Sequence, residues 1–142
     1  MKLFIKTTGA LAAGAFVLGT MGAVADASSL SDFYKRNKMT MYIGYSAGGG
    51  YDRYARTLAR HITRHIPGNP SIVPKNYTGA GGLRLANSLY NSFPQDGTNM
   101  GHIGRQVPLE DLIGNKKVRF KADKFNWIGS LNQEYSVCAF WH

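Results

Sequence analysis

Residues 39–66 read MTMYIGYSAGGGYDRYARTLARHITRHI, which places a strand, a glycine-rich turn and a helix in direct succession. The first part, MTMYIGY, is rich in β-branched and aromatic residues and predicts a β-strand over 39–45. From Tyr51 to Ile66, apolar residues recur at the spacing of one helix face, which predicts an amphipathic helix. The opposite face carries four arginines: Arg53, Arg56, Arg60 and Arg64.

The same succession continues along the chain. SIVPKN (71–76) predicts a second strand, and Pro74 places that strand near an edge or a bulge, since proline cannot donate to a sheet ladder. TGAGG leads into a helix from about residue 83 to residue 93, NMGHIG (99–104) predicts a third strand, and VPLEDLIG predicts a short helix ending at Gly114. The βαβαβα order predicts an α/β fold with a mainly parallel sheet flanked by helices.

The last part of the chain has a different pattern. NKKVRFKADKF is polar and irregular, whereas NWIGSL (126–131) and YSVCAFWH (135–142) each predict a further strand. Cys138, the single cysteine, is expected to be a small buried apolar residue within the second of them. With 142 residues, the chain has the length of one domain.

The amino terminus has the three parts of a secretory signal peptide. Lys2 and Lys6 precede the apolar run GALAAGAFVLGTMGAV, and Ala23-Val24-Ala25 forms a small-residue cleavage site. We predict that residues 1–25 are cleaved, that residues 26–142 form the mature domain, and that the protein is periplasmic. The alternative is an uncleaved anchor, although the run is shorter than the ~20 residues of a membrane-spanning helix.

The formal net charge is +9, and a positive charge of this size is attracted to nucleic acids and to anionic membrane surfaces. The basic residues are scattered, however, and the arginine stripe of the helix is explained by a solvated face. Export also argues against a nucleic-acid partner. We therefore predict no nucleic-acid binding.

Both glycine-rich loops lie between a strand and the start of a helix. In a parallel sheet, this is the edge where ligands bind, and helix amino termini offer unpaired N–H groups to anions. The two loops therefore predict a clamp for a carboxylate or a phosphate.

Nucleotide and metal motifs are incomplete in this sequence. TGAGGLR starts like G-x-G-x-x-G, but Arg84 replaces the last glycine, and neither loop contains the Gly-Lys-Ser/Thr of a phosphate-binding loop. His61 and His65 share a helix face without the glutamate of H-E-x-x-H or a third ligand. We predict no cofactor and no metal.

Gly44 to Gly48 read G-x-S-x-G, the pattern of a hydrolase nucleophile elbow. A triad in that chain order would pair Ser46 with Asp111 or Asp123 and then with His142, which is the final residue. The elbow also follows the first mature strand, so no earlier loop supplies the oxyanion donor. An exported α/β serine hydrolase using Ser46 is thus the alternative to a protein without catalytic residues.

The region from about residue 33 to residue 142 resembles the amino-terminal domain of the Bug-type solute-binding proteins of tripartite tricarboxylate transporters. The resemblance is carried by the G-G-x-x-D loop (48–52), the N-x-x-G-A-G-G block (76–82) and the P-x-D-G turn (94–97), in that order. It implies one lobe of a two-domain periplasmic binding fold whose second domain is missing here or truncated. It also implies a monomeric, non-enzymatic protein that passes a small carboxylated solute to a membrane permease.

The resemblance also implies the residues that hold the ligand. The first loop contributes Ser46, Ala47, Gly48, Gly49, Gly50 and Asp52; the second contributes Gly79, Ala80, Gly81 and Gly82; the third contributes Gly104 and Arg105. Ala47 stands where proline is usual in the family.

Several of these residues have more than one possible role. Asp52 suits the first turn of a helix, and could alternatively contact an amino group or order the loop. Arg105 either pairs with a second carboxylate or is an ordinary surface arginine. If backbone amides form the cradle, a bulky side chain at Gly49 should harm binding more than loss of the Ser46 hydroxyl, by clashing with the ligand or by forbidding the backbone angles.

Overall fold

The computed structural model describes residues 22–133, 135 and 138–141. Its elements are helix α1 (Gly22–Arg36), strand β1 (Met39–Ile43), helix α2 (Gly50–Ile62), the 3-10 turn η1 (Thr63–His65), strand β2 (Ile72–Asn76), the 3-10 turn η2 (Ala80–Gly82), helix α3 (Leu83–Asn91), strand β3 (Asn99–His102), helix α4 (Val107–Leu112) and the 3-10 turn η3 (Ala122–Lys124). Most of the predicted signal peptide lies outside the described residues and stays a prediction. Within the described part of the chain, no helix is both long and apolar enough to cross a membrane.

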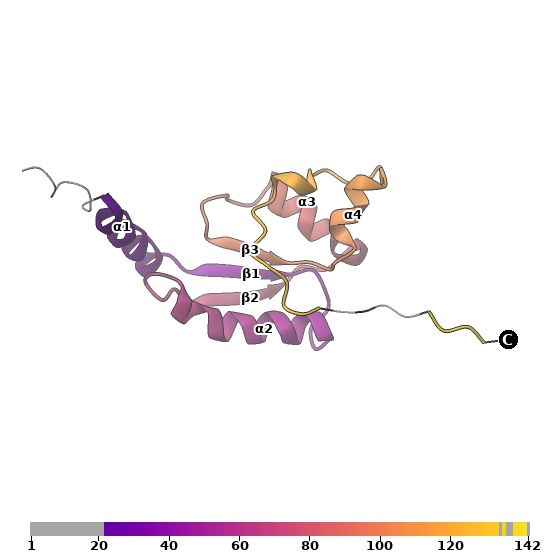
Figure 1. The fold of residues 1–142 in the computed structure, drawn as a ribbon, viewed down its shortest axis with the longest axis horizontal. Coiled ribbons are helices and arrows are strands. Elements are labelled where there is room, and N and C mark those ends of the chain that lie inside the picture. Colours follow the sequence, from indigo (N-terminus) through magenta and orange to yellow (C-terminus); the bar gives the residue numbers. More distant parts are fainter. Residues whose placement is uncertain (1–21, 134, 136–137, 142) are drawn as a thin grey trace, which may run out of the picture.

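The three strands form one parallel sheet in the order β2-β1-β3. Helix α2 lies on one side of this sheet, and α3 and α4 lie on the other (Figure 1). This arrangement confirms the predicted α/β fold with a parallel sheet flanked by helices. The three strands β1, β2 and β3 and the helices α2, α3 and α4 follow the predicted order. Their ends differ from the predicted ones by a few residues.

Each face of the sheet has its own apolar packing. Met41 and Ile43 of β1 pack against Ala55 and Ala59 of α2, and all four side chains are buried. On the other side, a second cluster joins α3 to α4 and to the segment that follows it, with Leu83, Ala86, Val107 and Phe120 at its centre. Helix α3 approaches β3 so closely that a Cβ atom at Gly101 would overlap the Leu89 side chain.

The hydrogen bonds of β1 show which backbone groups of β2 face outward. Met39 N–H donates to Ser71 C=O, and Tyr77 N–H donates to Ile43 C=O. Because parallel strands alternate the side to which their backbone groups point, Pro74 must face away from β1. The backbone nitrogen of the proline therefore faces away from the sheet, on the outer side of an edge strand. No neighbouring strand lies there, so the missing N–H costs the sheet no hydrogen bond. Of the two positions predicted for Pro74, near an edge or near a bulge, the structure shows the edge.

The sequence-based prediction failed at both ends of the domain. Helix α1 was not predicted. It contacts the rest of the domain through Tyr34, whose hydroxyl donates to Gly97 C=O. Residues 126–131 are not a strand, so that prediction is wrong: Trp127 and Ile128 are exposed, and no described strand pairs with this segment. A segment with strand-like composition forms a strand only where a neighbour completes its hydrogen bonds.

The second predicted strand of the tail, 135–142, is also absent from the positions that the structure describes, namely 135 and 138–141. Cys138 is exposed, so the expectation of a buried cysteine is wrong. Residues 134, 136, 137 and 142 lie outside the described residues.

Leu85 provides a test of the packing between α3 and the sheet. Its side chain is fully buried, whereas Leu112 on α4 is 78% exposed. We expect Leu85→Ala to lower the free energy of unfolding by about 2–5 kcal/mol, because it removes buried methyl groups and leaves a cavity. Leu112→Ala, the matched control, should change it by less than about 0.5 kcal/mol. Urea unfolding followed by circular dichroism measures both; equal effects would contradict the packing described here.

Candidate functional site

Three loops meet at the carboxyl end of the sheet. The β1–α2 loop (44–49), the β2–α3 loop (77–82) and the β3–α4 loop (103–106) each leave a neighbouring strand at this edge. Strand β1 leads to α2 on one face of the sheet, while β3 leads to α4 on the other face (Figure 1). In doubly wound α/β proteins, ligands bind at the point where such a reversal occurs between adjacent strands.

Tyr45 ties the three loops together. Its hydroxyl donates to Gly81 C=O at 3.0 Å and accepts a hydrogen bond from Gln106 Nε2 at 3.0 Å. Gln106 Nε2 also lies 3.2 Å from Gly81 C=O. A Cβ atom at Gly104 would overlap the Tyr45 hydroxyl and the Gln106 side chain, so only glycine allows this approach. One phenol thus fixes the relative positions of all three loops.

An aromatic cluster supports the same edge from the α2 side. The rings of Tyr45 and Tyr51 stack with centroids 4.1 Å apart, and the His102 ring lies 5.6 Å from that of Tyr51. Burial lowers the pKa of His102, while a hydrogen bond with the Tyr51 backbone acts in the opposite direction. The imidazole is therefore neutral at pH 7, and its buried Nδ1 has no hydrogen-bond partner among the described residues.

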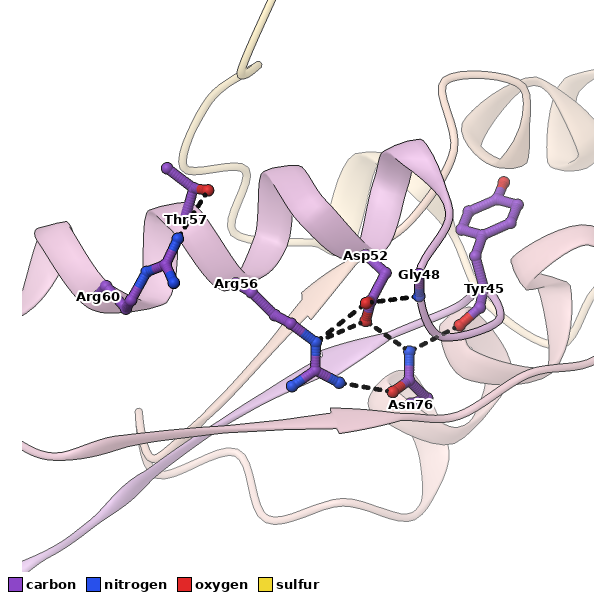
Figure 2. Close-up of polar contacts among 7 residues, drawn as sticks. All are labelled: Tyr45, Gly48, Asp52, Arg56, Thr57, Arg60 and Asn76. Carbon is purple, nitrogen blue, oxygen red and sulfur yellow. Dashed lines mark hydrogen bonds and ion pairs between the residues drawn. The ribbon is translucent and has the colours of Figure 1, made fainter.

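Asp52 holds the β1–α2 loop in place (Figure 2). Its carboxylate, 3% exposed as a residue, accepts hydrogen bonds from Gly48 N–H at 2.9 Å, from Arg56 Nε at 2.9 and 3.0 Å, and from Asn76 Nδ2 at 2.8 Å. Asn76 also donates to Tyr45 C=O at 2.9 Å and accepts from Arg56 Nη2 at 2.8 Å. The network therefore joins the loop after β1, the first turns of α2 and the end of β2.

The surroundings of Asp52 favour its ionised form. The hydrogen bond from Arg56, followed by those from Gly48 and Asn76, lowers the pKa of Asp52 from 3.8 to about 2. Both carboxylate oxygens are already engaged by protein donors. Of the roles considered from the sequence, the structure shows the loop-ordering hydrogen bond.

The network changes which amides of the first loop are available to a ligand. Gly48 N–H is bound to Asp52, whereas the N–H groups of Ala47 and Gly49 have no protein acceptor within the described residues. Those of Gly50 and Tyr51 belong to the first turn of α2, where no intrahelical acceptor exists. All five positions from Ser46 to Gly50 are exposed. The available donors are therefore a subset of the predicted cradle.

The other predicted site residues divide into exposed and buried ones. Ala80, Gly81 and Arg105 are exposed and Gly79 is partly exposed, whereas Gly82 and Gly104 are buried. Gly82 N–H donates to Gly79 C=O, and a Cβ atom at Gly82 would contact Val107 and Tyr45. The two buried glycines thus allow close packing between the loops and do not present their surfaces to solvent.

The expected backbone requirement at Gly49 is not what the structure shows. Gly49 has φ −75° and ψ 173°, angles that any residue adopts, and a Cβ atom there would have only Ser46 C=O nearby, at 3.6 Å. The residue that requires glycine is Gly48, at φ 85°. A side chain at Gly49 would therefore be accommodated by the loop and would reach the solvent side of it.

The surroundings of Ser46 differ from those of a nucleophile elbow. Ser46 is exposed, has no positive φ, and makes no hydrogen bond within the part of the chain that the structure describes. Asp111 is bound to Lys121 Nζ and Ala122 N–H, both at 3.1 Å. His142 lies outside the described residues.

The predicted histidine pair does not lie on one regular helix. Helix α2 ends at Ile62, so His61 is on the helix and His65 is in η1, where its Nε2 accepts from Arg64 Nε at 3.2 Å. Over the described residues, no three histidine, cysteine, aspartate or glutamate side chains gather as metal ligands would.

Four important residues of this site were not identified from the sequence: Tyr45, Arg56, Asn76 and Gln106. Asn76 had a usable signal, because an asparagine at the carboxyl end of a strand lies where neighbouring loops need hydrogen-bond partners. Arg56 was assigned to a solvated helix face, yet it pairs with Asp52. Neither a scan against protein-family models nor a search of characterised proteins finds a match to this chain.

The pKa of Asp52 leads to a prediction about acid stability. Because the folded-state pKa is lowered, the ionised carboxylate stabilises the fold above about pH 4, and this contribution is lost as the pH falls towards 2. We expect Asp52→Asn to lower the urea midpoint at pH 7 and to flatten the decline in stability between about pH 4 and pH 2. The control is Asp123→Asn, a carboxylate on an exposed turn. An unchanged pH profile in Asp52→Asn would contradict the network.

Proposed function

We propose that this chain is the amino-terminal lobe of a Bug-type periplasmic solute-binding protein, which binds a small carboxylated solute at its glycine loops and delivers it to a membrane permease. The proposal starts from the resemblance of the loop, block and turn motifs. The observation that carries it is a group of amides without a protein acceptor at the switch point of the sheet, those of the exposed residues Ala47, Gly49 and Gly50 and of the partly buried Tyr51.

Each motif of the resemblance has a physical role in building this edge. Asp52 of G-G-x-x-D fixes the first loop through Gly48, and Asn76 of N-x-x-G-A-G-G connects that loop to β2. Asp96 of P-x-D-G accepts hydrogen bonds from Thr98 N–H at 2.9 Å and from Thr98 Oγ1 at 2.5 Å, which closes the turn before β3. The three motifs therefore contribute to positioning the loops.

The chemistry of the edge suits a carboxylate. Exposed N–H groups at the start of α2 combine hydrogen-bond donation with the positive end of the helix dipole. The carboxylate of Asp52, which would repel an anion, is buried and neutralised by Arg56. An anion approaching the loop therefore meets donors before it meets negative charge. A second lobe would supply the other wall of the site, as in hinge-closing binding proteins.

A titration of the whole chain tests the proposal. Citrate, succinate, glutamate and benzoate represent tricarboxylates, dicarboxylates, acidic amino acids and aromatic acids. For at least one of them, we expect backbone amide shifts in the ¹⁵N NMR spectrum at residues 46–51, extending to 79–81. Shifts scattered over the surface, or absent from these loops for every probe, would contradict the proposal.

Two substitutions separate a backbone cradle from a role for the serine. Gly49→Val should leave the fold intact, because φ −75° accommodates valine, but the side chain should shield the neighbouring amides and weaken binding strongly. Ser46→Ala should remove at most one hydrogen bond, worth about 0.5–1.5 kcal/mol. Calorimetry with the best-binding carboxylate gives the order of the two effects.

The reverse order in folded proteins would rule out the cradle. Hydrolysis of a simple ester by the unmodified chain, abolished in Ser46→Ala, would instead support the hydrolase.

A further inference from the structure

A groove of about 470 Å³ lies between α2 and the outer edge of β2, and none of the predicted site residues lines it. Arg56 and Arg60 contribute from the helix, Thr63 follows the helix end, and Ser71 and Ile72 contribute from the start of β2. This volume is in the range of sites for small organic ligands.

No acidic residue lines the groove, and its net positive charge comes from Arg60, because Arg56 is paired with Asp52. Arg56 and Arg60 are four residues apart, so they lie one turn apart on the same face of α2. Within the described residues, Arg60 has no acidic partner and donates only to Thr57 Oγ1, at 3.3 Å. Its charge is therefore available to an anion in the groove.

Arg56 is already oriented before any ligand arrives. Its Nε is bound to Asp52 and its Nη2 to Asn76, which leaves the second terminal nitrogen without a partner in the described region. Figure 2 shows the Arg56 guanidinium pointing from the helix toward Asn76, with β2 running below it, while the Arg60 guanidinium is turned back toward Thr57. A guanidinium fixed in this way loses less freedom when it binds an oxyanion.

The rest of the lining is apolar or neutral. Ala59, Pro70, Ile72 and Pro74 provide an apolar wall, and Ser71, Thr63 and Asn69 provide neutral polar groups. Pro74 adds no backbone donor at this outward position, so the wall of the groove at this point is hydrocarbon.

We propose that this groove is a second binding site, for an organic oxyanion whose phosphate or carboxylate head pairs with Arg60 and Arg56 and whose apolar body lies on Pro70, Ile72 and Pro74. The site lies along α2 and is separate in its residues from the glycine loops, so it does not depend on the function proposed for them.

Phenyl phosphate, benzoate and inorganic phosphate are the probes, titrated into the whole chain at constant ionic strength. NMR signals of the Arg60 Nε–H group and of the Asn69 and Ser71 amides report on the groove, and residues 46–51 report on the glycine loop. We expect phenyl phosphate or benzoate to shift the groove signals, and inorganic phosphate to bind there more weakly because it cannot use the apolar wall. The ratio between the first two probes identifies the preferred head group.

Arg60→Gln and Arg53→Gln are matched variants that remove the same charge from the same helix, and Arg53 does not line the groove. Arg60→Gln should weaken binding of the better organic probe by about tenfold or more, as expected for the loss of a charged hydrogen-bonding group. Arg53→Gln should change it by less than about twofold, since it alters only the screened surface charge. Arg60→Lys should bind with intermediate affinity, because it keeps the charge and loses the planar fork.

Three outcomes would overturn the proposal. Equal losses in Arg60→Gln and Arg53→Gln would mean general electrostatic attraction. Shifts confined to residues 46–51 would place the anion at the glycine loop. Equal affinity for inorganic phosphate and the organic probes would remove the role of the apolar wall.

Discussion

The buried carboxylate of Asp52 is the interaction on which the candidate site depends. A buried negative charge is tolerated only when it is paired and hydrogen bonded, and here Arg56, Asn76 and Gly48 meet that condition. The three partners come from the helix, the neighbouring strand and the loop itself. Satisfying one charge therefore fixes three segments, and the exposed amides beside Gly48 take their direction from it.

Tyr45 completes this arrangement from the other side of the loop. Its carbonyl accepts from Asn76, while its hydroxyl bonds to the loops after β2 and β3. Figure 2 shows the ring turned away from the Asp52 network. A single residue after β1 thus connects a charged network on the α2 side to a neutral one on the α3 side. The two networks meet in the backbone of Tyr45, and Gly48, Gly49, Gly50 and Gly81 remain exposed to solvent, whereas Gly82 and Gly104 are buried.

The sequence was sufficient for the parts of the fold that depend on local periodicity. The spacing of Ala55 and Ala59 predicted the buried face of α2, and Pro74 predicted a position near an edge or a bulge, because both patterns follow from one element and its immediate surroundings. The glycine loops were placed correctly for the same reason.

The missed features depend on residues far apart in the chain. Asn76 reaches Tyr45 across 31 positions, and Gln106 reaches it across 61. Nothing local marks Asp52 as buried, since an acidic residue in a first helical turn is usually solvated. The apolar pattern around Trp127 was read as a strand although pattern alone does not supply a pairing partner.

The outward orientation of Pro74 makes the two margins of the sheet unequal. On β2, the proline interrupts the row of outward donors, which discourages another strand from adding there. On β3, Thr98 and His102 direct their carbonyls to β1, so Gly101 turns both its N–H and its C=O away from the sheet. That margin carries neither a proline nor a charged residue between Asn99 and His102. The two edges of the sheet therefore differ. The β2 edge disfavours the addition of another strand, whereas the β3 edge has outward backbone groups with which another strand can pair.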